Sequence, residues 1–234
     1  MRMSSNKKNT LTPFEEYLLE KRRQMLMSEN FQGREVLEVG IFKGDNLHQI
    51  ALRRPQALYG AAYTEADRRR AQRELTGLEV DVATIESDSL PFPDFAFDLV
   101  FSDTFFQFLT DENNFKSLLA DSCRVCDDRL VLIEHTEEKN VVQNGMACRT
   151  VKTYAGICKK NDLELASVSY INAAISIRFN TFLFRHFPPD SDARPLAIFL
   201  QKLSLPVTKI LDSFFPASHH LTKMVFVRKK EEYY

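Results

Sequence analysis

The stretch 34–47 (REVLEVGIFKGDNL) constrains the fold of this chain more than any other. Its apolar run, 36–39, predicts a short strand that is buried on both faces. Gly40 ends the run, Gly44 follows, and Asp45 with its neighbour offers N-cap chemistry for a helix. A strand, a glycine turn and a helix open a βαβ unit, and small ligands bind where such a helix begins at a strand end. The stretch therefore predicts a ligand site in a doubly wound domain.

Glu38 places a carboxylate at the tip of this strand, where it suits an ammonium group or a ribose hydroxyl better than a phosphate. The pattern Glu38-x-Gly40-x-Phe42-x-Gly44 resembles motif I of class I S-adenosylmethionine-dependent methyltransferases, in which an acid precedes three alternating glycines. Phe42 replaces the middle glycine, as in catechol- and caffeoyl-CoA-type O-methyltransferases. The resemblance implies S-adenosylmethionine as the cofactor, held by Glu38, Gly40 and Gly44. The alternative is the glycine turn of any doubly wound domain.

Length and charge exclude several classes of protein. The chain has 234 residues, 44% of them hydrophobic, and a formal net charge of −1, which suits one domain with a well-filled core. The balanced charge argues against nucleic acid as a partner. No apolar run reaches the roughly 18 residues of a membrane span. Residues 1–10 are polar and basic without the apolar segment of a signal peptide, so we expect a disordered tail and a cytoplasmic protein.

The four cysteines have two possible uses. Cys123 and Cys126 have CxxC spacing, but no second CxxC or paired histidines lie near them, and Cys148 and Cys158 are isolated. A zinc or redox site is one use. Small buried hydrophobic residues in a reduced cytoplasm are the other, and we favour it.

The second strand carries a departure from the family pattern. Residues 57–63 predict a strand, Thr64 an N-cap, and 65–75 a charged helix. The family places an acid at the end of this strand to accept from both ribose hydroxyls, whereas Ala62 stands there in this chain. Glu65, in the first helical turn, is the residue that we expect to replace it. The run 68–70 of three arginines predicts a solvated helix face.

The stretch 86–102 carries the second motif. It reads Glu-Ser-Asp-Ser-Leu-Pro-Phe-Pro-Asp-Phe-Ala-Phe-Asp-Leu-Val-Phe-Ser and resembles the methyltransferase pattern of an acidic residue before Leu-Pro-Phe and Phe-Asp-hydrophobic-Val. The resemblance implies that Asp88 accepts from the adenine amino group and that Ser89 offers a backbone N–H to the ring. An exocyclic amine needs an acceptor at the rim of an apolar slot. The alternative is a proline-containing loop between two strands.

Asp103, Phe106 and His135 are the candidates for contact with a substrate. Asp103 and Phe106 follow the fourth predicted strand, at the sheet edge where substrates bind in doubly wound folds. In catechol-type O-methyltransferases an Asp at this place binds magnesium, but His135-Thr136 replaces that family's Asp-Asn pair, so we expect no metal. His135 is the candidate general base, because the ordinary pKa of histidine lies near neutrality. The alternative is a histidine with a purely structural role.

The segment 171–220 separates the last two predicted strands and is rich in aromatic and aliphatic residues. Pro188-Pro189 and Pro206 divide it into two or three predicted helices. A lid over an apolar substrate, a dimer interface, a patch on a membrane surface and additional core are its possible uses. We favour a lid or cap that selects the partner rather than performs chemistry.

The sequence thus predicts one α/β domain over residues 11–234, a doubly wound, mostly parallel seven-stranded sheet with a helical insertion before the last strand. The resemblance implies methyl transfer from S-adenosylmethionine to a small or lipid-like acceptor. The competing function is that of a degenerate, non-catalytic methyltransferase fold kept for binding or scaffolding, which Phe42 and Ala62 favour. A nicotinamide-binding oxidoreductase is disfavoured, because its acid would stand at Ala62. A homodimer and a peripheral membrane contact stay open.

Overall fold

The computed structural model describes residues 11–143, 145–188, 194–214 and 218–229, so the expected tail 1–10 lies outside the described residues. The chain divides into two compact units. We call residues 25–170 and 219–234 the sheet unit, and residues 1–24 and 171–218 the helical unit. The predicted insertion therefore groups with the start of the chain. Whether 11–234 acts as one domain with a cap stays a prediction.

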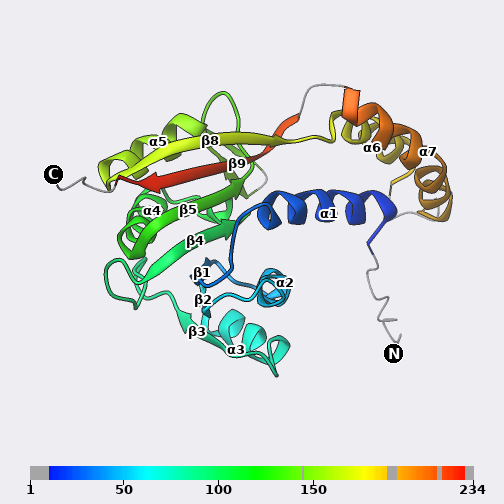
Figure 1. Ribbon diagram of the computed structural model, residues 1–234. Helices are drawn as coiled ribbons and strands as arrows, with labels where there is room; N and C mark the ends of the chain where they lie inside the picture. The colour runs from blue at the N-terminus through cyan, green and yellow to red at the C-terminus, as the bar shows by residue number, and fades with distance from the viewer. Residues whose placement is uncertain (1–10, 144, 189–193, 215–217, 230–234) are drawn as a thin grey trace, which may run out of the picture. The chain divides into compact units, whose positions relative to one another are not determined.

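The sheet unit is built on a seven-stranded sheet in the order β3-β2-β1-β4-β5-β9-β8 (Figure 1). The pairings among β1 to β5 are parallel, and β9 runs antiparallel to β5. This confirms the predicted doubly wound, mostly parallel sheet. The strands are β1 Glu35–Val39, β2 Ala57–Ala62, β3 Val80–Thr84, β4 Phe97–Asp103, β5 Cys126–Glu134, β8 Leu163–Ile171 and β9 Ser218–Arg228.

Helices cover both faces of this sheet, with α2 and α3 on one face and α4 and α5 on the other (Figure 1). Their bounds are α2 Asp45–Ala51, α3 Glu65–Glu74, α4 Glu112–Val125 and α5 Val151–Lys160. A short 3-10 helix, η1 Phe106–Phe108, follows β4, and a hairpin that the sequence analysis missed, β6 Val141–Gln143 with β7 Met146–Cys148, precedes α5. The hairpin strands were missed because three residues are too few to show an alternating pattern.

Local sequence signals explain where these helices begin. The side chain of Thr64 accepts a hydrogen bond from the backbone N–H of Asp67 at 3.1 Å, and Asp111 accepts from the N–H groups of Asn113 and Asn114 at 2.9 Å each. Thr64 is the N-cap that the sequence predicted. The N-cap of α2 differs, because Gly44, not Asp45, occupies that position and makes no side-chain cap bond.

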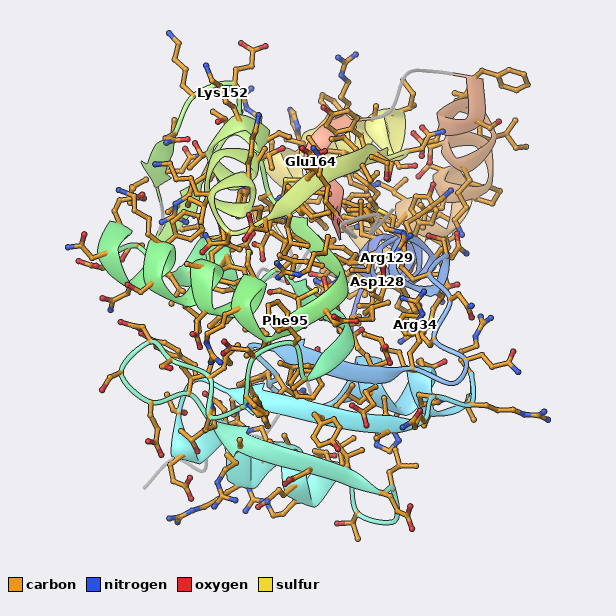
Figure 2. The ribbon with its side chains drawn as sticks, turned by 60° about the vertical axis from the view of Figure 1, so that its left-hand side comes forward. Arg34, Phe95, Asp128, Arg129, Lys152 and Glu164 are labelled. Carbon is orange, nitrogen blue, oxygen red and sulfur yellow. The ribbon has the colours of Figure 1, made fainter. Side chains whose placement is uncertain are left out.

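The core of the sheet unit lies between β1, β4, β5 and the helices α4 and α5. Four of the five residues of β1 are buried, as expected for a strand covered on both faces. All four cysteines are buried free thiols. At the amino end of the sheet, the Arg34 guanidinium pairs with Asp128 at 3.0 Å, and Figure 2 shows the two beside Arg129. These charges lie at the opposite end of the sheet from the carboxyl ends of β1 and β4.

The helical unit contains α6 Ala174–His186, α7 Arg194–Phe214 and α1 Pro13–Met27 as far as Gln24. Thr12 and Glu15 form a capping box at the start of α1, because each side chain accepts from the other residue's backbone N–H. Pro206 lies inside α7, so the prediction that it divides the segment was wrong. Within the described residues, no helix is long and apolar enough to cross a membrane.

Candidate functional site

The site begins where β1 and β4 end side by side. The two strands are parallel neighbours with Glu38 opposite Phe101, so Glu38 and Asp103 reach the same edge of the sheet. One amide joins them, because Asn46 Nδ2 donates to Glu38 Oε1 at 2.9 Å and to Asp103 Oδ2 at 3.1 Å. Asn46 lies in the first turn of α2. Two carboxylates and a helix start thus meet at one point, which favours a cationic group.

The glycine turn fits closely against an aromatic ring. Gly40 has φ 83°, which favours glycine, and a Cβ placed on it would lie 2.0 Å from Cγ of Phe105. At Gly44, with φ 80°, a Cβ would meet the side chain of Leu75 at 2.7 Å. The Phe105 ring also contacts Tyr63, with ring centroids 5.7 Å apart, and Phe106 at 5.5 Å. Gly40 is therefore required for packing against Phe105, and electron-rich rings line this part of the edge.

Glu134, at the end of β5, holds the turn that carries these rings. Its Oε1 accepts from the backbone N–H of Phe105 at 3.1 Å and of Phe106 at 3.0 Å, and its Oε2 accepts from Gln107 N–H at 3.1 Å. The side chain is fully buried, and burial raises its pKa to about 8, with the Phe106 and Gln107 N–H groups acting in the opposite direction. Glu134 thus fixes Phe105 and Phe106 relative to β4.

The candidate base His135 directly follows Glu134. Its side chain is partly buried, and its backbone N–H donates to Gln107 Oε1 at 3.4 Å. The carboxyl ends of β4 and β5 lie side by side, with Asp103 opposite Ile133, so His135 lies at the edge that carries Asp103 and Phe106. The Phe106 ring is fully buried. Contact with a substrate therefore falls more readily to Phe105, which is only partly buried, than to Phe106.

Asp88 lies in a tight turn between β3 and β4. Ser87 and Asp88 both have positive φ, 50° and 61°, and the backbones of Glu86 and Ser89 exchange two hydrogen bonds. The Ser89 N–H thus already donates to Glu86, so a contact between this N–H and an adenine ring would require the turn to open. The Asp88 carboxylate is partly buried, and Asn114 can donate to its Oδ2 at 3.1 Å.

The expected ribose contact is occupied by other groups. Ala62 is the last residue of β2, so no acid stands at that strand end. Glu65 accepts from Arg68 at 2.6 Å, from Arg69 at 3.0 Å and from Thr84 Oγ1 at 3.1 Å. These hydrogen bonds lower the pKa of Glu65, those of Arg68 and Arg69 most, to about 2. Glu65 is therefore a carboxylate already paired on the helix surface.

The resemblance implies S-adenosylmethionine as the cofactor. The residues present suit some parts of this ligand better than others. The two carboxylates joined by Asn46 suit a ligand end that carries an ammonium and a sulfonium, and Asp88 offers an acceptor for an amino group. No acidic residue stands at the end of β2 to accept hydrogen bonds from the ribose hydroxyls. Asn46 and Phe105 were missed as site residues. Asn46 had been taken only as a cap, and nothing in the sequence shows that Phe105 folds over Gly40. Among the described residues, no group of three or more His, Cys, Asp and Glu side chains could hold a metal.

Comparison with known proteins finds a family model for the central part of the chain. Residues 37–129 match the family model described as a methyltransferase domain, and these residues contain the glycine turn, Asp88 and Asp103. No curated protein matches the chain at a significant level.

Solved structures with the same fold are numerous and distant in sequence. Geranyl diphosphate C-methyltransferase from Streptomyces coelicolor A3(2) is 12% identical with a TM-score of 0.65, and the match covers 92% of this chain and 79% of that one. A putative S-adenosylmethionine-dependent methyltransferase from Listeria monocytogenes is 14% identical with a TM-score of 0.60, covering 92% and 100%. The [4+2]-cyclase SpnF is 16% identical with a TM-score of 0.59, covering 89% and 80%. This likeness shows the fold alone.

Proposed function

We propose that this chain is a class I S-adenosylmethionine-dependent methyltransferase and that it transfers a methyl group to a small or lipid-like acceptor. The match of residues 37–129 to a methyltransferase domain and the shared fold support this proposal. The observation that carries the proposal is the pair of carboxylates, Glu38 and Asp103, joined by the Asn46 amide beside the glycine turn. Two acids at the start of a helix disfavour a phosphate and favour a cation. This charge pattern supports S-adenosylmethionine better than a nucleotide phosphate.

Each end of the ligand has a proposed partner. Glu38 and Asp103 receive the ammonium of the methionine end, and the turn Gly40 to Gly44 lies against the ligand backbone. The Phe105 and Tyr63 rings offer electron-rich faces to the positive sulfur. Asp88 accepts from the adenine amine. Glu65 contacts the ribose only by giving up a bond to Arg68, Arg69 or Thr84.

The chemistry that S-adenosylmethionine supplies when bound is a methyl group on a sulfonium. Methyl transfer is an in-line displacement, so orienting the reactants and excluding water contribute most of the acceleration. Glu134 serves orientation, because its three backbone bonds hold the Phe105–Phe106 turn in place. His135 takes the proton when the acceptor must lose one.

The side chains at the carboxyl edge of the sheet indicate the kind of methyl acceptor. The aromatic side chains at the end of β4 suit an apolar group. One structural neighbour acts, by its name, on geranyl diphosphate, a compound with an apolar geranyl chain and a charged diphosphate. The cyclase among the neighbours illustrates that this fold also supports other chemistry. The non-catalytic alternative is favoured by Ala62 and by the engaged Glu65.

Calorimetry with S-adenosylhomocysteine tests the proposal. We expect saturable binding by the full chain and weaker binding by Glu38→Gln and Asp103→Asn, which remove the negative charges. Asp81→Asn, an exposed acid on β3, is the matched control and should bind like the wild type. Absence of binding at millimolar ligand would contradict the proposal and favour the non-catalytic alternative.

Asp88→Ala tests the adenine end separately. We expect S-adenosylhomocysteine binding to weaken by about 1–3 kcal/mol, because the adenine amine would lose its acceptor. Inosine-containing ligand, which lacks that amine, should bind the wild type and the variant equally. If both ligands bound more tightly to the wild type than to the variant, Asp88 would act by holding the turn and not by contacting the adenine.

A further inference from the structure

Helix α7 has its polar and apolar faces reversed relative to an ordinary packed helix. Its buried positions are Ala197, Gln201, Leu205, Thr208 and Asp212, and three of these five are polar. Its exposed positions form an apolar stripe at helical spacing, which we call the α7 stripe: Leu196, Phe199, Leu203, Val207, Ile210 and Phe214. Leu203 is 68% exposed and Phe214 is 79% exposed. A helix that buries polar residues and exposes apolar ones requires an explanation.

The orientation of α7 is fixed by hydrogen bonds within the helical unit. Asp212 Oδ1 accepts from the backbone N–H groups of Ile175 at 2.8 Å and Ser176 at 3.1 Å, so it caps α6 in place of Ala173, whose side chain cannot. Asp212 Oδ2 accepts from Ser176 Oγ at 2.6 Å and from the Tyr17 hydroxyl at 3.1 Å. Gln201 accepts from Phe14 N–H at 3.3 Å. Turning the α7 stripe inward would break all of these bonds, so the stripe faces outward.

The exposed charges of α6 and α7 have one sign. The helices α6 and α7 contain five basic residues, Arg178, Arg185, Arg194, Lys202 and Lys209, and their single acid, Asp212, is buried. Lys202 and Lys209 lie seven positions apart, on one flank between the stripe and the buried face. Lys202 is exposed, and Lys209 lies over the Tyr17 ring.

We propose that the α7 stripe docks this protein on an anionic lipid bilayer. An exposed apolar face with lysines along its border is the pattern of a helix that lies in the membrane interface, with apolar side chains among the acyl chains and cations at the headgroups. A second copy of the chain fits less well, because pairing two such helices would bring lysines together with no exposed acid of α6 or α7 to neutralise them. The inference does not depend on the proposed methyl transfer.

Vesicle sedimentation with the full chain tests the docking. We expect binding to vesicles of phosphatidylglycerol and phosphatidylcholine, little binding to phosphatidylcholine alone, and a decrease as salt rises. The triple variant Phe199→Ser, Leu203→Ser, Ile210→Ser should bind at least about tenfold more weakly, because its buried apolar area is lost. The matched control is Leu52→Ser with Val142→Ser, which removes exposed apolar side chains of the sheet unit and should leave binding unchanged.

Two charge-reversal variants test the electrostatic contribution to vesicle binding. Lys202→Glu should weaken binding to the anionic vesicles by about tenfold. Lys152→Glu makes the same change of net charge at an exposed position of α5 in the sheet unit (Figure 2) and should have no effect. Equal loss in both variants would show that only net charge matters, and would overturn the role of α7.

Three other results would overturn the proposal. The first is absence of binding to anionic vesicles. The second is a concentration-dependent dimer that the triple variant abolishes, which would make the α7 stripe an interface between copies. The third is a large fall in melting temperature in the triple variant, which would show that the stripe is buried within the chain. Circular dichroism at low temperature checks that each variant is folded.

Discussion

Helices α4 and α7 are both amphipathic, but their buried faces differ in polarity. α4, in the sheet unit, buries Phe115, Leu118 and Leu119 against the core. α7, in the helical unit, buries three polar residues, Gln201, Thr208 and Asp212, beside Ala197 and Leu205, whereas Phe199 and Leu203 are exposed. Burial of apolar area stabilises α4 with little directional preference, whereas hydrogen bonds to Asp212 specify which side of α7 faces inward.

The two units use their apolar and polar residues in different ways. The sheet unit uses its apolar residues for stability and presents polar groups, Glu38, Asp88 and Asp103, at its ligand edge. The helical unit uses polar groups to order its helices, and α7 exposes the apolar side chains of the α7 stripe. We therefore expect substitutions of like residues to have unlike effects in the two units.

The largest expected difference in stability is between serine substitutions of two leucines. Leu118→Ser, in α4, should lower the free energy of unfolding by about 4 kcal/mol, because it leaves a cavity and buries a hydroxyl. Leu203→Ser, in α7, should change it by less than about 0.5 kcal/mol, because Leu203 is exposed. Urea unfolding of both variants measures the contrast. Similar losses in the two variants would contradict the orientation of α7.

Gly40→Val should lower the free energy of unfolding of the sheet unit by about 3 kcal/mol. The new side chain would collide with Phe105 and would require a β-branched residue at φ 83°. Binding of S-adenosylhomocysteine should be lost with it. The double variant Gly40→Val, Phe105→Ala should recover part of the stability, and failure to recover any would leave backbone strain as the only cause.

Asp212→Ala should destabilise the helical unit by about 2 kcal/mol. It removes the acceptor for Tyr17, for Ser176 and for two backbone N–H groups at the start of α6. Asp212→Asn retains one acceptor oxygen and should lose less. Hydrogen exchange of α6 amides measures both, and unchanged protection in Asp212→Ala would show that α7 is held by other contacts.

The last prediction is a pH dependence of the folding stability that comes from Glu134. The pKa of Glu134 is raised from 4.5 to about 8. Between these two pH values the side chain is protonated in the folded protein and ionised in the unfolded chain. This contribution to stability is complete below about pH 4.5 and disappears as the pH rises through about 8. The stability of the wild type relative to Glu134→Gln should therefore fall across that range. Parallel pH profiles of the two proteins would contradict a raised pKa.

The sequence predicts the sheet unit well because its signals are local. The apolar run 36–39 and the cap Thr64 each act within a few residues. The site was predicted less completely. Asn46 joins Glu38 to Asp103 only once two strands and a helix have come together, and Phe105 reaches Gly40 across the sheet. Such contacts follow from tertiary structure and leave no local pattern.

The helical unit was the least predictable part. Helical spacing shows that 196, 199, 203, 207 and 210 share a face, but spacing alone does not tell which face points inward. Ordinary reasoning buries the apolar face, as in the added core that the sequence left open as an alternative. The bonds from Asp212 to α6 bury the polar face instead, and they join residues 36 and 37 positions apart. The lid interpretation stays a prediction.

Hydrogen–deuterium exchange of the full chain with and without S-adenosylhomocysteine tests the central claim most directly, namely that the ligand binds at the edge of the sheet unit. We predict that the ligand slows exchange in residues 38–46, 86–90 and 103–107, which contain Glu38, Asp88 and Asp103, and leaves α7 unchanged. Slowed exchange confined to α7, or no change in any of the three segments at saturating ligand, would contradict it.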